Sequence, residues 1–130
     1  MKTIIRMILA ATFSGICIGA EEKAKDQPAT VEQAEKWIGA GVQLLDVRTQ
    51  EEWDEGHLKG AKRIPWAEEG FAAKVKATLD PKKPVLVYCR SGGRSAKAVH
   101  ALRDAGFAKV HDMAGGITAW EKQGKPVEKK

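Results

Sequence analysis

Apolar and polar positions along the chain follow helical spacing in some stretches and strand-like spacing in others. Apolar residues recur with helical spacing from Thr30 to Gly39, and Thr30 with Gln33 forms a capping-box pattern at the start of that helix. The stretch 71–79 repeats apolar residues every four positions, which predicts another helix. Thr49 and Glu52 suggest a second capping box, which would start a short helix at 49–53. Further helices are expected at 95–105 and 116–123, and strands at 42–47, 62–64, 85–88 and 109–111.

The strongest strand signal is the run Val85–Tyr88, which is rich in β-branched residues and apolar on both faces. A strand of this kind lies buried within a parallel sheet. The alternation of strands with helices therefore predicts an α/β fold, with a mostly parallel central sheet flanked by helices on both faces. In such sheets ligands bind beyond the carboxyl ends of the strands, and Cys89 comes directly after this strand.

The first 20 residues have the pattern of a secretory signal peptide. Lys2 and Arg6 precede an uncharged run over 7–20 that ends in small residues. We therefore expect export to the periplasm or out of the cell. Two alternatives stay open: an uncleaved membrane anchor, and lipid attachment at Cys17, which the residues before it disfavour. The expected organisation is a signal peptide at 1–20, a flexible linker at 21–29 and a single domain at 30–128.

Composition and charge exclude several classes of function. Hydrophobic residues make up 43% and charged residues 30% of the chain, as in soluble globular proteins. The formal charge of +5 falls to +3 on cleavage, because two of the 22 basic residues leave and all 17 acidic residues stay. The remaining net positive charge is small, and the basic residues are spread along the chain rather than clustered. We therefore expect no nucleic-acid binding, and no stable membrane association once the signal peptide is removed.

Cys89 is the only cysteine that remains after cleavage, so it cannot form an internal disulfide. Gly92 and Gly93 allow a tight turn after it, and a helix expected from Ser95 would direct its free N–H groups and positive dipole end toward the sulfur. Together with basic neighbours, these features lower the pKa of a thiol and predict a nucleophilic thiolate. The alternative is a buried structural cysteine in an ordinary glycine-rich connection.

The spacing from Cys89 to Arg94 is C-x4-R. Thiolate phosphatases use C-x5-R, in which a longer loop surrounds a tetrahedral phosphate with N–H donors. The shorter loop favours a sulfur atom carried on the cysteine over a phosphoryl group.

Three stretches of the chain form a set of motifs. They are Leu45-Asp46-Val47-Arg48 with Glu52-Trp53, Gly56-His57, Gly60-Ala61 and Ile64-Pro65; the loop from Tyr88 to Ser95; and Gly115-Gly116 with Ala119-Trp120 and Gly124 to Pro126. In this order they resemble the motifs of the rhodanese-like sulfurtransferases. The resemblance covers nearly all of the chain after the expected linker, from about residue 30 to 127, and is greatest to the exported single-domain thiosulfate sulfurtransferases of bacteria.

The resemblance implies a reaction in two halves. The Cys89 thiolate takes the outer sulfur of a donor such as thiosulfate as a persulfide, and a thiophilic acceptor, cyanide or a thiol, then removes it. These small molecules are the expected partners, and neither a metal nor an organic cofactor is implied. Arg94 lies at a position where members of the family often carry a residue that influences the choice of sulfur donor. The residue at the position of Arg90 varies within the family. The substrate-binding residues implied are Arg90, Ser91, Gly92, Gly93, Arg94 and Ser95.

Other conspicuous residues receive structural roles from the resemblance. It implies an ion pair of Asp46 with Arg48 that holds the loops at the edge of the sheet, and a His57 that fixes a loop. Two further functions stay open. One is a thiolate phosphatase or arsenate reductase on the same scaffold, which the short loop disfavours. The other is a non-catalytic rhodanese-like module that binds a partner protein, which the intact Cys89 disfavours.

Overall fold

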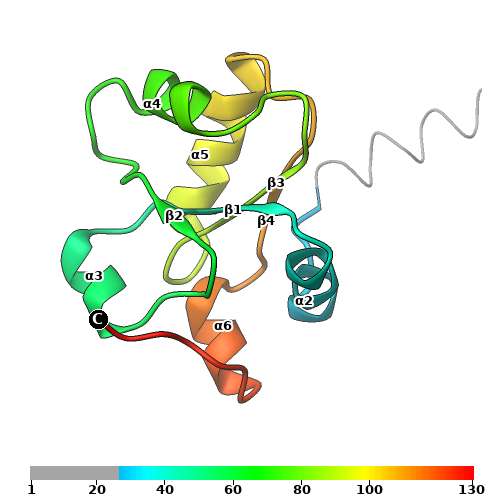
Figure 1. Ribbon diagram of the computed structural model, residues 1–130, viewed down its shortest axis with the longest axis vertical. Coiled ribbons are helices and arrows are strands. Elements are labelled where there is room, and N and C mark those ends of the chain that lie inside the picture. Colours follow the sequence, from blue (N-terminus) through cyan, green and yellow to red (C-terminus); the bar gives the residue numbers. More distant parts are fainter. Residues whose placement is uncertain (1–26) are drawn as a thin grey trace, which may run out of the picture.

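The computed structural model describes residues 27–130, so the expected signal peptide at 1–20 and most of the expected linker lie outside the described residues. Helices and strands alternate along the described chain, as the sequence pattern predicts (Figure 1). The helices are α2 (Val31–Gly39), α3 (Gln50–Glu55), α4 (Phe71–Thr78), α5 (Gly93–Asp104) and α6 (Gly116–Lys122). The strands are β1 (Gln43–Asp46), β2 (Lys62–Arg63), β3 (Val85–Tyr88) and β4 (Val110–Asp112).

The strands form one sheet in the order β2-β1-β3-β4, and every pairing between them is parallel. The register pairs Asp46 on β1 with Tyr88 on β3, so the carboxyl ends of the two central strands lie side by side. Cys89 follows Tyr88 directly, which places it at the edge of the sheet where α/β proteins bind their ligands.

Side chains that alternate along the strands build a separate core on each face of the sheet. Val85 and Val87 face the core that holds residues of α4 and α5. Leu86 and Tyr88 face the opposite core, which holds residues of α2 and α6. Figure 1 shows these helix pairs on the two sides of the sheet. The predicted α/β fold with helices on both faces is therefore confirmed.

Both predicted capping boxes are present. Thr30 accepts a hydrogen bond from the Gln33 N–H at the start of α2, and Thr49 accepts one from the Glu52 N–H at the start of α3. In each box the N3 side chain also accepts a hydrogen bond from the backbone N–H of the cap. The sequence therefore locates the starts of both helices to the residue.

Several expected boundaries differ from the observed ones by one or two residues. The helix after Cys89 begins at Gly93 rather than at Ser95, because Gly92 takes a φ of 118° and turns the chain two residues earlier. The last strand is shifted by one residue, to Val110–Asp112. Ala29, which we expected in the flexible linker, is buried and donates its N–H to the Asp112 carbonyl at 2.7 Å. The ordered fold therefore includes at least this last residue of the expected linker.

The ion pair of Asp46 and Arg48 is present and buried. The Arg48 guanidinium donates to both carboxylate oxygens of Asp46, at 2.8 Å for the shortest contact, and also to the Gly56 carbonyl at 2.7 Å. Arg48 therefore connects the end of β1, through Asp46, with the loop after α3, through Gly56. Both segments lie next to the edge of the sheet that carries Cys89. The structural role of the ion pair is the one that the family resemblance implied.

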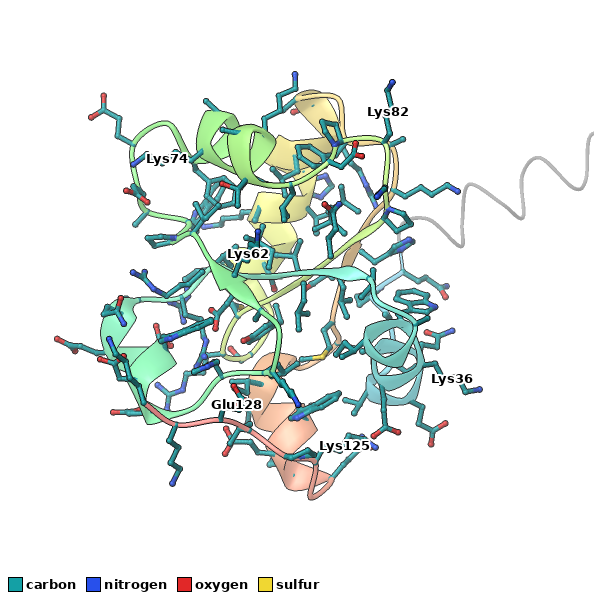
Figure 2. The ribbon with its side chains drawn as sticks, viewed as in Figure 1. Lys36, Lys62, Lys74, Lys82, Lys125 and Glu128 are labelled. Carbon is teal, nitrogen blue, oxygen red and sulfur yellow. The ribbon has the colours of Figure 1, made fainter. Side chains whose placement is uncertain are left out.

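Basic side chains are distributed over the molecule. Figure 2 shows lysines from α2, β2, α4 and the C-terminal segment, and these do not gather into one stripe. Within residues 27–130, no helix is both long and apolar enough to cross a membrane.

Candidate functional site: the Cys89 loop

Two helices hold the loop that carries Cys89. The loop leaves the buried strand β3 and enters α5 at Gly93, and the first turn of α6 packs against it. The N–H groups of Ile117 and Thr118 donate to the carbonyl groups of Cys89 and Arg90, at 3.0 and 3.1 Å. These bonds occupy carbonyl oxygens of the loop, so its backbone is fixed from the side of α6.

Gly116 is required for this close approach. A Cβ atom at this position would lie 2.5 Å from the carbonyl oxygens of both Cys89 and Arg90. Gly116 also has a φ of 60°, in the left-handed region that favours glycine. The glycine pair that the family resemblance singled out therefore serves the loop directly.

The Cys89 sulfur accepts hydrogen bonds from its own loop. The Gly92 N–H donates to Sγ at 3.1 Å, and the Ser95 hydroxyl lies 3.3 Å from it. Burial raises the pKa of the Cys89 thiol, because a charged sulfur loses contact with water. Hydrogen bonds from the Ser95 hydroxyl and from the N–H groups of Ser95, Gly92 and Ser91 outweigh this and lower the pKa below its ordinary value. The arrangement thus stabilises a thiolate.

The two arginines of the loop differ in their surroundings. Arg94 donates to both carboxylate oxygens of Glu52, with N–O distances of 2.6 and 2.8 Å. Arg90 is exposed, and across residues 27–130 its side chain forms no hydrogen bond or ion pair. The sequence places both charges near the sulfur, but it does not reveal that Arg94 is already held by a carboxylate.

A polar groove of about 740 Å³ runs beside the loop. Acidic and basic side chains both line it, together with the first turn of α6. The lining residues are Arg48, Glu52, Glu55, Gly56, Arg90, Ile117, Thr118, Glu121 and Lys122. Because Arg90 belongs to both the loop and the groove, a small charged molecule in the groove would lie next to the Cys89 loop.

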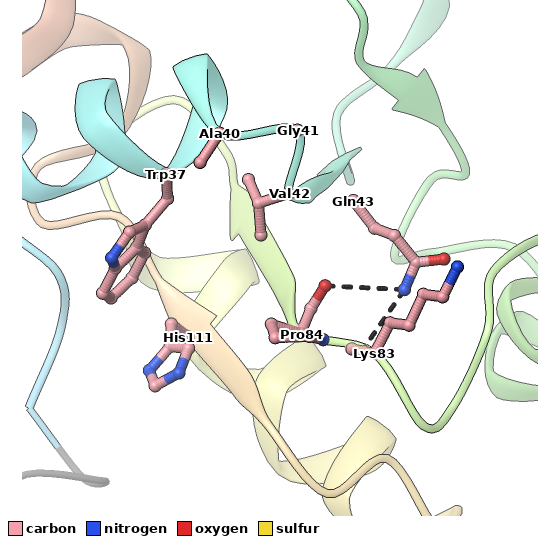
Figure 3. Close-up of a pocket in the computed structure, with 8 residues that line it drawn as sticks. All are labelled: Trp37, Ala40, Gly41, Val42, Gln43, Lys83, Pro84 and His111. Atoms are coloured by element: carbon pink, nitrogen blue, oxygen red, sulfur yellow. Dashed lines mark hydrogen bonds between the residues drawn. The ribbon is translucent and has the colours of Figure 1, made fainter.

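A second pocket, of about 430 Å³ and mostly apolar, lies at the other end of the sheet (Figure 3). It is formed where β1 and β3 begin, and includes Trp37, Pro84 and His111. Its lining has no thiol or hydroxyl side chain, and Cys89 lies beyond the opposite end of β3. The pocket is therefore separate from the candidate site at the Cys89 loop.

His57 takes no part in the sulfur site. Its ring stacks on Trp53 with centroids 3.7 Å apart, and its Nδ1 lies 3.0 Å from the Trp53 carbonyl oxygen. These contacts fix the loop after α3. Among the described residues, no group of three or more His, Cys, Asp and Glu side chains is placed to hold a metal ion.

The residue that the sequence argument missed is Glu52. The sequence indicates a capping-box residue that also belongs to the first of the three motif stretches, but it does not indicate the contact with Arg94 from the opposite side of the site. The sequence signal for this contact is that an acidic residue, Glu52, occurs in the first motif stretch and a basic residue, Arg94, in the second. Motif spacing does not reveal such a contact, since the two residues lie 42 positions apart.

The parallel sheet and the thiol at its carboxyl edge define an α/β protein with a hydrogen-bonded cysteine in a strand-to-helix loop. Within that class, the family of the rhodanese-like domain matches residues 30–123, and the chain belongs to this family.

Similar proteins agree with this assignment. The chain is 37% identical over 118 residues to a protein of Arabidopsis thaliana named thiosulfate sulfurtransferase 16, chloroplastic. The matched region covers 84% of this chain and 98% of the relative. The chain is also 36% identical to thiosulfate sulfurtransferase 18 of the same plant, over 85% of this chain and 90% of the relative. Among solved structures, a rhodanese-related protein from Thermoplasma volcanium has a TM-score of 0.70 and 30% identity, over 80% of this chain and 99% of that one.

Proposed function

We propose that this protein is a sulfurtransferase that moves a sulfane sulfur from a donor such as thiosulfate to a thiophilic acceptor through a persulfide on Cys89. The observation that carries the proposal is the Cys89 sulfur, which is hydrogen-bonded by the Gly92 N–H and the Ser95 hydroxyl at the edge of the sheet. The names of the two plant relatives support thiosulfate as a donor.

The first half-reaction loads the cysteine. The Cys89 thiolate attacks the outer sulfur of thiosulfate, a new S–S bond forms, and the S–S bond of the donor breaks with its electron pair leaving on sulfite. The persulfide that results keeps its negative charge beside the N–H groups of the loop. A thiolate is needed because a thiol is a much weaker nucleophile, and the lowered pKa of Cys89 supplies it.

The second half-reaction releases the sulfur. Cyanide or a thiolate attacks the outer sulfur of the persulfide, and the Cys89 sulfur leaves with the electron pair as a thiolate. The hydrogen bonds from Gly92 and Ser95 stabilise this leaving group as they stabilise the resting state. Both half-reactions require only the donor and the acceptor. Because the donor reacts and sulfite leaves before the acceptor reacts with the persulfide, the kinetics should be ping-pong.

Intact-mass analysis after incubation with thiosulfate tests the proposal. We expect the protein to gain one sulfur atom, about 32 Da, which cyanide removes, and we expect Cys89→Ser to gain nothing. Ser91→Ala is the matched control and should still load, because it removes only an exposed hydroxyl and keeps the backbone N–H that helps to lower the pKa of Cys89. A Cys89→Ser variant that turns over thiosulfate, or a wild type that hydrolyses aryl phosphates and ignores thiosulfate, would refute the proposal.

We also propose that the protein is exported, on the strength of the basic start and uncharged run within residues 1–20. Expression of the full chain in a bacterium should give a mature protein that begins near Glu21 in the periplasmic or external fraction. Full-length protein confined to the cytosol would contradict this.

A further inference from the structure

The carboxylate of Glu52 is fixed before any substrate arrives. Its Oε1 accepts hydrogen bonds from the Thr49 N–H at 3.3 Å and from the Thr49 hydroxyl at 3.1 Å, as part of the capping box of α3. Both of its oxygens also accept from Arg94. Hydrogen bonds from Arg94, assisted by those from Thr49 and opposed by burial, lower the pKa of Glu52 to about 2. The residue is therefore an anion throughout the physiological pH range.

Arg94 lies between two negative groups. Hydrogen bonds to Glu52 are the main reason that its pKa is raised; burial opposes this, and the charges of Glu52 and of the Cys89 thiolate add to it. The guanidinium is thus close enough to Cys89 to interact with its charge, while its N–H groups point into a carboxylate. A bidentate pair of this kind neutralises most of the charge that an incoming anion would experience.

Few other cations are available to a donor at this site. Arg48 lines the groove but donates to both oxygens of Asp46. Arg90, by contrast, lines the groove, belongs to the loop and is unpaired within the described chain. The loop therefore offers one free guanidinium, although its sequence contains two. The exposed ammonium of Lys122, which forms no ion pair within the described chain, adds a second cation at the wall of the groove.

We infer that Glu52 determines donor specificity: by holding Arg94 in a bidentate pair, it disfavours dianionic sulfur donors relative to donors that carry a single negative charge. The inference rests on the proposed sulfur-transfer function. Release of Arg94 would add a cation to those of Arg90 and Lys122. Thiosulfate, with two negative charges, would gain more from this added charge than a monoanionic thiosulfonate or persulfide, because the attraction scales with the charge of the donor. Glu52 exerts this effect through Arg94, which it holds, and is therefore a positioning residue.

The variant Glu52→Gln should remove the negative charge at this position and preserve the fold. Glutamine has the same shape, and it is accepted at the third position of a capping box. This chain itself uses Gln33 in that position at the start of α2. The matched control is Glu51→Gln, which removes a negative charge from the first turn of the same helix at an exposed residue that does not contact Arg94.

The first measurement compares two donors that react alike but differ in charge. Thiosulfate is a dianion and benzenethiosulfonate a monoanion, and cyanide serves as acceptor for both. In Glu52→Gln we expect the KM for thiosulfate to fall about three- to tenfold with kcat little changed, and a clearly smaller fall for benzenethiosulfonate. The difference should shrink in 1 M KCl, where the screening length is about 3 Å. Arg94→Gln in the same background should abolish the gain.

The second measurement does not depend on sulfur transfer. Iodoacetate carries one negative charge and iodoacetamide none, and both alkylate a thiolate in the same way. Glu52→Gln should raise the ratio of the iodoacetate rate to the iodoacetamide rate at Cys89, and Glu51→Gln should leave it near the wild-type value. An unchanged ratio together with unchanged donor preference would overturn the inference. If the wild type acquires no sulfur from either donor, the proposed function fails, whatever the alkylation ratio shows about the charge.

Discussion

At the scale of single residues, Cys89 combines two opposing influences. Its side chain is buried, with 1% of the residue exposed, and burial alone would favour the neutral thiol. Hydrogen bonds from Ser95 and from three loop N–H groups reverse the direction of the pKa shift. Ionisation of Cys89 therefore depends more on these short-range donors than on the charge of Arg94, which Glu52 holds.

Removal of the Ser95 hydroxyl tests that balance. In Ser95→Ala the pKa of Cys89 should rise, because the sulfur stays buried and loses a hydrogen bond from the hydroxyl 3.3 Å away. The rate of alkylation by iodoacetamide, followed against pH, should shift to higher pH. Sulfur loading at neutral pH should fall about tenfold, from the loss of roughly 1.5 kcal/mol. Ser91→Ala should keep the wild-type profile, and equal profiles for both variants would contradict the assignment.

Much of the site could be predicted at this scale, and one part could not. The thiol, its two glycines and the nearby helix start are adjacent in sequence, so their proximity is a matter of local geometry. The contact of Arg94 with Glu52 joins two elements through the tertiary fold. No local pattern specifies it, and for that reason the sequence suggested a free arginine where the structure has a paired one.

At the scale of elements, short sequence signals located most boundaries because the residues that cause them are local. The capping boxes at Thr30 and Thr49 involve side chains three positions away, and both are present in the structure. The start of α5 was predicted two residues too late, because its cap is Gly92, which uses a positive φ and no side-chain bond. A cap made by backbone conformation alone leaves only a glycine as its signal in the sequence.

The support that α6 gives the loop can be tested at Gly116. Gly116→Ala would place a methyl group 2.5 Å from the carbonyl oxygens of Cys89 and Arg90, so the loop or the helix must move. The rate of sulfur loading should fall at least about tenfold, since small displacements of a reacting group are costly. Stopped-flow or quenched mass measurements of loading give the comparison.

Gly124→Ala is the control for the loop experiment. Gly124 has a similar positive φ of 73°, but a Cβ there meets no atom within 4 Å. The backbone strain should cost about 1–2 kcal/mol of unfolding free energy while the loading rate stays near that of the wild type. If both variants load sulfur equally slowly, α6 has no specific role in shaping the loop.

At the scale of the whole molecule, the fold class followed from the sequence because every local signal agreed with it. Alternating helices and strands and a doubly apolar central strand left few architectures open. The order β2-β1-β3-β4 and the pairing of α4 with α5 on one face were not predicted. The spacing of apolar residues in a helix shows which side of the helix is apolar, but not which face of the sheet it packs against. Packing across the entire chain determines that face.

The pair of Glu52 with Arg94 also joins α3 to α5, so it should contribute to global stability in a pH-dependent way. The pKa of Glu52 is about 2 in the folded protein, below its ordinary value of 4.5. A carboxyl group whose pKa is depressed by folding stabilises the protein above its unfolded pKa and loses that contribution as the pH falls through the folded value. Since the Arg94 side chain is 35% exposed, the contribution at neutral pH should be about 1 kcal/mol.

The unfolding free energies of wild type and Glu52→Gln, measured in urea across pH, should therefore converge in acid. We expect a constant difference of about 1 kcal/mol above pH 5, a decline between about pH 4.5 and pH 2, and no difference below that. Thr30→Ala is the matched control, because its capping partner Gln33 does not ionise. That variant should lose about 1 kcal/mol at every pH at which the protein stays folded. A difference for Glu52→Gln that persists unchanged to pH 2 would show that the pair stabilises the fold through packing rather than charge.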